Sequence, residues 1–238
     1  IIGATYTGNR GAAAMLVSTV EKLRAVLPDN TEFHVLSLYR EKPDTARERG
    51  VRIVSLTAVK LLGIMPMLCL LYSLFSRVGF IRKLLLRYSP LETVASADVF
   101  LDLSGISFVD GRGITLLYNI CCLLPGLLLG VPVFKMSQAM GPFQGKLNRW
   151  AALKLLPRLR CIYSRGPVTT EHLRNLGLWN LEEAADLAFL LDEGQDIPSA
   201  EESQEKPALT IGIAPSQVLL NQCDKTDVDY IGAMIRAV

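Results

Sequence analysis

The stretch VPVFKMSQAMGPF, residues 131–143, has the pattern of a buried strand that ends in a polar turn. Its first half is mostly apolar, Ser137 and Gln138 come next, and Gly141-Pro142 marks a turn. In open α/β sheets, ligands bind at the carboxyl ends of the strands. We therefore expect an α/β fold whose functional residues gather where strands of this kind end.

Three other stretches follow the order of strand, polar loop and helix. They are IIGATYTGNRG (1–11) ahead of a helix at 12–27, ADVFLDLSGISFVDGRG (97–113), and RCIYSRGPVTTEHLRNLG (160–177). Further strands are expected at 32–38, 51–54 and 185–191, and a helix at 144–156. This alternation is typical of an open, parallel α/β sheet.

An acidic stretch at residues 192–207 contains Pro, Ser and Gln and is typical of an interdomain linker. Residues 209–214, LTIGIA, have the pattern of a new strand. The expected organisation is one α/β domain at 1–191, a linker at 192–207, and the truncated start of a second domain at 208–238. Because both ends of the chain are abrupt, we expect a fragment clipped at both ends.

Composition excludes several classes of function. The net charge of the 238 residues is only +2, so no nucleic-acid partner is expected. Five cysteines without regular spacing argue against a disulfide framework and favour a reducing cytoplasm. Two distant histidines, His34 in an apolar strand and an exposed His172, give no metal site. No secretory signal, metal or cofactor is expected.

Two long uncharged runs need separate interpretations. The run at 61–76 lies within residues 57–88 and is flanked by Lys60, Arg77 and Arg82. It predicts either a buried helix pair or an interfacial segment that meets anionic lipid. The run at 113–134 is interrupted by Pro125 and several glycines, so it predicts a helix followed by a buried strand, not a membrane span.

Polar residues in the loops are the candidates for chemistry. The first loop, 5–11, could hold an anion at the start of its helix, but its glycine spacing fits no phosphate-loop motif and a tight turn explains it as well. Ser104, Gly105 and Ser107 could let a sugar or phosphate approach the backbone. Asp110 is either a general base for a sugar hydroxyl or a turn residue ahead of glycine.

Arg165 lies between a strand and a helix start. A guanidinium there suits phosphate or carboxylate, so Arg165 is the best candidate for an anion site. The alternative is a surface arginine that pairs with a nearby acid.

Taken together, five ordered stretches resemble the polysaccharide pyruvyl transferase family across nearly all of residues 1–191. They are GATYTGNRGAAAM, ADVFLDLSGISFVDGRG, GVPVFKMSQAMGPF, SRGPVTTEHLRNLG and AADLAFLL. No stretch is specific alone, whereas the ordered set is. The chain departs from the family where Ser104-Gly105-Ile106-Ser107 replaces a run of glycines.

The resemblance implies a GT-B-like fold, with one complete Rossmann-like domain here and the truncated start of another. It implies transfer of a pyruvyl group from phosphoenolpyruvate, a donor substrate, to two sugar hydroxyls as a ketal in cell-surface polysaccharide synthesis. A lipid-linked saccharide acceptor and a peripheral contact at the inner face of the membrane would fit. The fragment alone is expected to be inactive. The implied residues are catalytic Asp110, donor-binding Arg165 and Gln138, and cleft residues Asn9, Gly11, Ser104, Gly105 and Ser107.

Two other classes remain open at this point. A nucleotide-sugar glycosyltransferase of the GT-B fold would differ mainly in its second half. A non-catalytic sugar- or anion-binding module would use the glycines for turns alone. A dinucleotide oxidoreductase has less support, because the first loop lacks the GxGxxG spacing.

Overall fold

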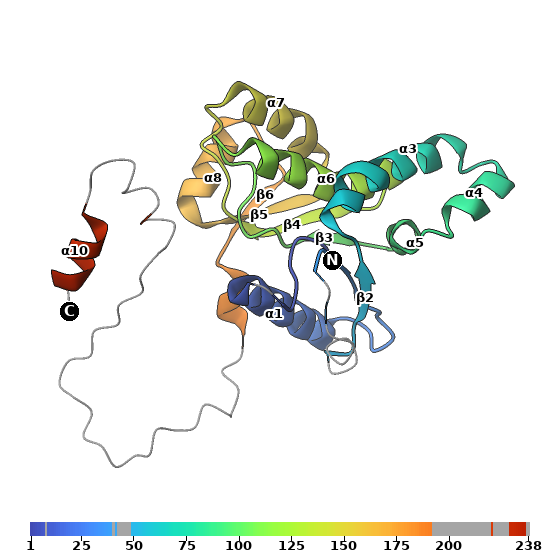
Figure 1. Cartoon of the computed structure of the whole chain (residues 1–238), viewed down its shortest axis with the longest axis horizontal. Helices are drawn as coiled ribbons and strands as arrows, with labels where there is room; N and C mark the ends of the chain where they lie inside the picture. The colour runs from blue at the N-terminus through green and yellow to red at the C-terminus, as the bar shows by residue number, and fades with distance from the viewer. Residues whose placement is uncertain (8, 40, 42–48, 192–219, 221–228, 237–238) are drawn as a thin grey trace, which may run out of the picture. The chain divides into compact units, whose positions relative to one another are not determined.

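The computed structural model describes residues 1–7, 9–39, 41, 49–191, 220 and 229–236 (Figure 1). It divides into two compact units, Ile1–Asp192 and Glu193–Val238. The second unit contributes the helix α10 (Tyr230–Arg236). The linker expected at 192–207 and the strand expected at 209–214 lie outside the described residues, so the domain boundaries stay predictions.

All strand pairings in the first unit are parallel, as the alternation of elements predicted. One group pairs β1 (His34–Ser37) with β2 (Arg52–Ser55). The other has the order β3 (Phe100–Asp102), β4 (Val133–Gln138), β5 (Cys161–Arg165) and β6 (Leu181–Ala184). Ile2 forms parallel bridges to Leu36 of β1 and to Asp102 of β3, and so joins the two groups.

The strand order reverses direction at Ile2. From Ile2, the chain first builds outward through β1 and β2, then returns to the other side of Ile2 and continues through β3 to β6. This is the order of a Rossmann-like sheet, whose ligand crevice lies at the topological switch point beyond the carboxyl ends of the strands. Here that point lies between the loops after Ile2 and after β3.

Helices cover both faces of the sheet (Figure 1). Successive strand residues point to opposite faces. Val35 packs in one apolar cluster with Leu16 of α1 (Arg10–Val26), whereas Leu36 belongs to the cluster that includes Cys122. The second cluster lies under a layer of helices: η1 (Lys60–Ile64), α3 (Met65–Phe75), α5 (Ser89–Ala95), α6 (Gly113–Leu129), α7 (Lys146–Leu155), η2 (Leu156–Arg158) and α8 (Gly166–Asn175).

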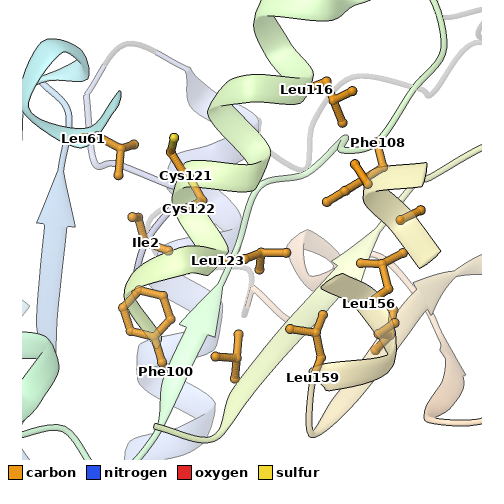
Figure 2. Close-up of a cluster of buried hydrophobic side chains, with 14 of the residues drawn as sticks. Ile2, Leu61, Phe100, Phe108, Leu116, Cys121, Cys122, Leu123, Leu156 and Leu159 are labelled. Carbon is orange, nitrogen blue, oxygen red and sulfur yellow. The ribbon is translucent and has the colours of Figure 1, made fainter. Parts of the chain in front are cut away.

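The centre of the core lies under α6. Figure 2 shows Cys121, Cys122 and Leu123 of this helix close to Ile2 and Phe100 of the sheet. Gly126 lets α6 approach the sheet, because a Cβ atom there would lie 2.5 Å from Cγ2 of Val133. Residues 113–134 contain the helix α6 and the start of the strand β4. The prediction of a helix followed by a buried strand is therefore confirmed. Among the described residues, no helix is long and apolar enough to cross a membrane.

The prediction of a strand at residues 185–191 is wrong. The edge strand β6 ends at Ala184, and a 3₁₀ turn, η3 (Leu187–Leu190), follows it. Asp186 caps this turn by accepting a hydrogen bond from the backbone N–H of Ala188 at 3.0 Å. Ser18 of α1 also donates to the Leu187 carbonyl at 2.8 Å, so the segment folds against α1 instead of extending along β5.

Residues 57–88 are partly buried and partly exposed, and contact of this segment with lipid stays a prediction. Met65 and Cys69 are buried, so η1 and the inner side of α3 form part of the core. The short helix α4 (Gly79–Leu85) has no buried residue.

Candidate functional site

A closed polar network lies at the carboxyl ends of β3 and β4. The strand register places Asp102 directly beside Lys135. Lys135 Nζ lies 2.5 Å from Asp102 Oδ2 and also donates to Gln138 Oε1 at 2.6 Å. Gln138 Nε2 donates to the Asp102 carbonyl at 2.7 Å, and Ser107 Oγ donates to Gln138 Oε1 at 2.6 Å. Asp102, Lys135, Ser107 and Gln138 have no exposed surface.

The electrostatics of this network favour the ionised form of Asp102. Burial alone would raise the pKa of Asp102, but the charge of Lys135 and hydrogen bonds from Lys135 and Ser104 outweigh it. The pKa of Asp102 therefore lies below its usual value. Lys135 Nζ also lies 5.4 Å from the centre of the buried Phe108 ring. The network fixes the ends of two central strands at the switch point.

Gln138 and Ser107 are thus committed to this network. Both ends of the Gln138 amide are bonded within the protein, which positions the strand end. Direct contact of Gln138 with a donor, and of Ser107 with an acceptor, stays a prediction.

The loop after β3 packs tightly against the loop after Ile2. Ser104 donates to Asp102 Oδ1 through its hydroxyl at 2.6 Å and through its backbone N–H at 2.9 Å. Gly3 has φ +88°, and a Cβ atom there would collide with Ser104 Oγ. Only glycine satisfies both the backbone angle and the close approach. The two loops at the switch point therefore form one surface.

Arg165 lies at this surface, at the end of β5. Its Nη1 pairs with Asp186 Oδ2 at 2.9 Å, and its Nε donates to the Ser137 carbonyl at 3.1 Å. Its Nη2 lies 3.6 Å from Met15 Sδ and would be 3.5 Å from a Cβ atom on Gly105. Arg165 thus pairs with an acid and also lies at the switch-point loops.

Ser137 has an unusual backbone conformation, with φ +46°. A non-glycine residue in this region is strained, and such residues cluster at functional sites. The carbonyl of Ser137 accepts a hydrogen bond from Arg165, and its hydroxyl donates to the Ala185 carbonyl at 2.5 Å. The strained turn therefore helps to hold Arg165 in position.

Asp110 is bound to the start of α7. It accepts hydrogen bonds from the backbone N–H groups of Gln144 at 2.7 Å and Gly145 at 3.1 Å, and from Asn148 Nδ2 at 2.8 Å. Burial raises the pKa of Asp110, but the hydrogen bonds from Asn148, Gln144 and Gly145 together outweigh it, so the pKa lies below its usual value. A carboxylate with a lowered pKa is a weaker base near neutral pH.

Asn9 and Gly11 lie at the start of α1. The Asn9 side chain caps the helix by accepting hydrogen bonds from the N–H groups of Gly11 at 2.9 Å and Ala12 at 3.2 Å. Both residues are exposed, and within the described part of the chain neither forms a hydrogen bond or ion pair with Arg165. A role in acceptor binding stays a prediction.

Sequence reasoning missed several residues that the fold brings to this edge. Asp186 faces Arg165, and His172 is half-buried, not exposed as expected, with its ring against the Gly141-Pro142 turn. The sequence could have indicated Asp102 and Lys135, because each is a lone charged residue within an apolar strand. Among the described residues, no cluster of three or more His, Cys, Asp or Glu could hold a metal.

A cavity of about 850 Å³ lies elsewhere, at the amino ends of the strands. Phe33, Phe100 and Phe134 are among the residues that line it. Neither Arg165 nor the switch-point loops line this cavity, so the cavity is not part of the site described above.

The fold and the site together define a Rossmann-like α/β protein with a polar, arginine-bearing site at its switch point. The model of one family, described as polysaccharide pyruvyl transferase, matches residues 9–236. The chain therefore belongs to the polysaccharide pyruvyl transferase family, a transferase family with a sugar or polysaccharide acceptor. No curated protein and no solved structure matches the chain.

Proposed function

We propose that this chain forms the first half of a transferase that moves a pyruvyl group from phosphoenolpyruvate to two hydroxyls of a sugar. The product would be a cyclic ketal on a cytoplasmic precursor of a cell-surface polysaccharide. The observation that carries the proposal is the place of Arg165, a cation at the switch-point loops of a chain that belongs to this family.

The reaction sets three chemical demands. The enol carbon C3 takes up a proton, and one sugar oxygen forms a bond to C2. The bond from C2 to the phosphate oxygen then breaks, and the second sugar oxygen closes the ketal. Phosphate leaves, and the two hydroxyl protons go to C3 and to a base. A cationic cradle, an acid and a base are therefore required.

Arg165 supplies the cation in this proposal. Its Nη1 and Nε are engaged with Asp186 and Ser137, whereas the hydrogen-bond partner of Nη2 in the described part of the chain is the sulfur of Met15, a weak acceptor. Gly105 leaves room beside Nη2. We place the phosphate or carboxylate of the donor there. Asp186 would hold the guanidinium plane in position and would compete with the donor for it.

The remaining assignments follow from the same proposal. Gln138 would contact the donor beside Arg165, while Asn9, Gly11, Ser104, Gly105 and Ser107 would line the cleft for the acceptor. Asp110 would serve as the base only if the bonds to α7 are released. A second Rossmann-like half, beginning within 208–238, would complete a GT-B-like fold and supply further donor-binding groups. Residues 1–238 alone would then be inactive, and residues 57–88 would contact the membrane.

The test is calorimetric titration of phosphoenolpyruvate into the intact native protein that contains residues 1–238. Replacing Arg165 by Ala should weaken binding about ten- to a hundredfold, because a hydrogen-bonded charge is lost. Arg165→Lys should retain part of the affinity. The matched control is Arg160→Ala, since Arg160 is exposed and precedes the same strand at its opposite end. Unchanged binding by Arg165→Ala would contradict the proposal, and saturable binding of a nucleotide sugar instead would indicate a glycosyltransferase.

A further inference from the structure

The helices that cover one face of the sheet expose large apolar side chains from three separate parts of the sequence. In the layer, α3 packs against α6 and α6 packs against α7 (Figure 1). Phe80 of α4 is 77% exposed and Trp150 of α7 is 57% exposed. The other prominent exposed residues are Leu74, Phe75, Ile114 and Leu147. We call these residues and the cations around them the helical-layer surface.

The stretch of chain that contains this surface has a strong excess of positive charge. Residues 49–170 contain 15 Lys and Arg but only four Asp and Glu, whereas the rest of the chain contains ten Lys and Arg and 19 Asp and Glu. The helices η1, α3, α4, α6 and α7 contain no acidic residue. The exposed cations are Arg77, Arg82, Lys83, Arg87, Lys146, Arg149 and Lys154. The net charge of +2 therefore conceals a charge separation.

We propose that the helical-layer surface binds a lipid bilayer that contains anionic headgroups. Exposed aromatic and aliphatic side chains enter the interface, and the cations meet the phosphates. Tryptophan together with Lys and Arg is the composition typical of such interfaces. A second copy of the chain is the weaker occupant, because two cationic faces of the same kind repel each other. The helices lie along the interface, since none of those described can cross a membrane.

The position of this surface gives it a role in the proposed reaction. The helices α6 and α7 begin beyond the carboxyl ends of β3 and β4, so Ile114 and Leu147 lie toward the edge that carries the switch-point loops. Binding to a bilayer would bring the site close to the headgroups, where the sugar of a lipid-linked acceptor lies. This part of the inference rests on the proposed function, but membrane binding itself does not.

The two tryptophans of the chain make the inference directly testable. Trp150 belongs to the helical-layer surface, whereas Trp179, which is exposed after α8, is not one of its residues. Two single-tryptophan proteins, Trp179→Phe and Trp150→Phe, are mixed at low salt with vesicles of phosphatidylcholine, with or without phosphatidylglycerol. We expect the emission of Trp150 to shift to the blue and to be quenched by brominated lipid, only with phosphatidylglycerol. The emission of Trp179 should not change.

Charge and apolar variants separate the two contributions. Arg82→Gln with Lys83→Gln should weaken vesicle binding on the order of tenfold or more, since each cation near an anionic surface contributes. Phe80→Ser should also weaken it, whereas Arg174→Gln on α8 should not. Failure of the wild-type protein to bind anionic vesicles would overturn the inference. A blue shift of the Trp150 emission that appears without lipid and increases with protein concentration would also overturn the inference. These vesicles contain neither sugar nor phosphoenolpyruvate, so the result is independent of the donor-binding test.

Discussion

At the scale of single residues, the buried pair of Asp102 and Lys135 is the least expected feature. Both side chains are fully buried at neighbouring positions of β3 and β4, and each is hydrogen-bonded within the network. A buried ion pair contributes little net stability compared with apolar residues, but the loss of one partner leaves an uncompensated charge. We therefore expect the pair to fix the geometry of the strand ends beneath the site.

Replacing Lys135 by Met should lower the free energy of unfolding by about 3–5 kcal/mol, because Asp102 would remain as an unpaired buried charge. The double variant Lys135→Met with Asp102→Asn should be more stable than the single variant, since no charge is left in the core. Urea unfolding followed by circular dichroism measures both. A single variant as stable as the wild type would contradict a buried ion pair.

The pH dependence of stability should report the same pair. The pKa of Asp102 is lower in the folded protein than in the unfolded chain, so its contribution is present above the unfolded pKa of about 3.9 and is lost as the pH falls through the folded value. Stability should therefore decrease below about pH 4. In Asp102→Asn this decrease should be shallower, and urea midpoints across the acid range test it. Identical slopes in the two proteins would show that Asp102 does not carry the effect.

At the scale of elements, the conformations of the loops after β3 and β4 are stabilised by tertiary contacts more than by the backbone preferences of their own residues. Phe108 and Phe143 have φ values of +50° and +66°, which are unfavourable for non-glycine residues. Both side chains are buried, and that burial offsets the strain. Asp110 connects the two loops by binding the chain just ahead of α7, which places a negative charge at the favourable end of that helix.

Replacing Asp110 by Ala should lower the free energy of unfolding by about 1 kcal/mol, since acceptors for two backbone N–H groups and for Asn148 are lost. Asp98→Ala is the matched control, because Asp98 is an exposed aspartate ahead of β3. Thermal unfolding of the two variants measures the difference. A variant that keeps wild-type stability but loses turnover would instead support the role of general base.

At the scale of the whole molecule, the first unit contains both apolar clusters. One cluster runs from Ile2 to Leu178 and the other from Ala4 to Leu103, with Leu187 packed against it. No residue of the second unit belongs to either cluster as described. The first unit therefore has its own core, although the second carries part of the family match.

A chain that ends at Asp192 should unfold cooperatively, with the same urea midpoint as residues 1–238. The physical reason is that cooperative stability comes from the buried core, and the core formed by the described residues lies within the first unit. Intrinsic fluorescence of Trp150 and Trp179 follows the transition. A much lower midpoint in the shorter chain would show that residues after 192 stabilise the first unit.

Much of the fold could be predicted because its signals are local. The alternation of strands and helices, the helix within residues 113–134 and the Gly-Pro turn after β4 follow from periodicity and from backbone preferences. Arg165 could be singled out in the same way, because it falls between a strand and a helix. The resemblance in the ordered stretches also led to the family that matches the chain.

The amino-acid sequence by itself determined the α/β class, the family and the position of the candidate loops along the chain. Only the tertiary structure decided which residues meet: Lys135 with Asp102 across 33 positions, Arg165 with Asp186, and Asp110 with the start of α7. It also turned residues 187–190 into a 3₁₀ turn against α1 and brought the exposed side chains of α3, α6 and α7 into one layer. The physical reason is that periodicity reports only which way a side chain points, whereas strand register and packing between distant segments decide what it contacts.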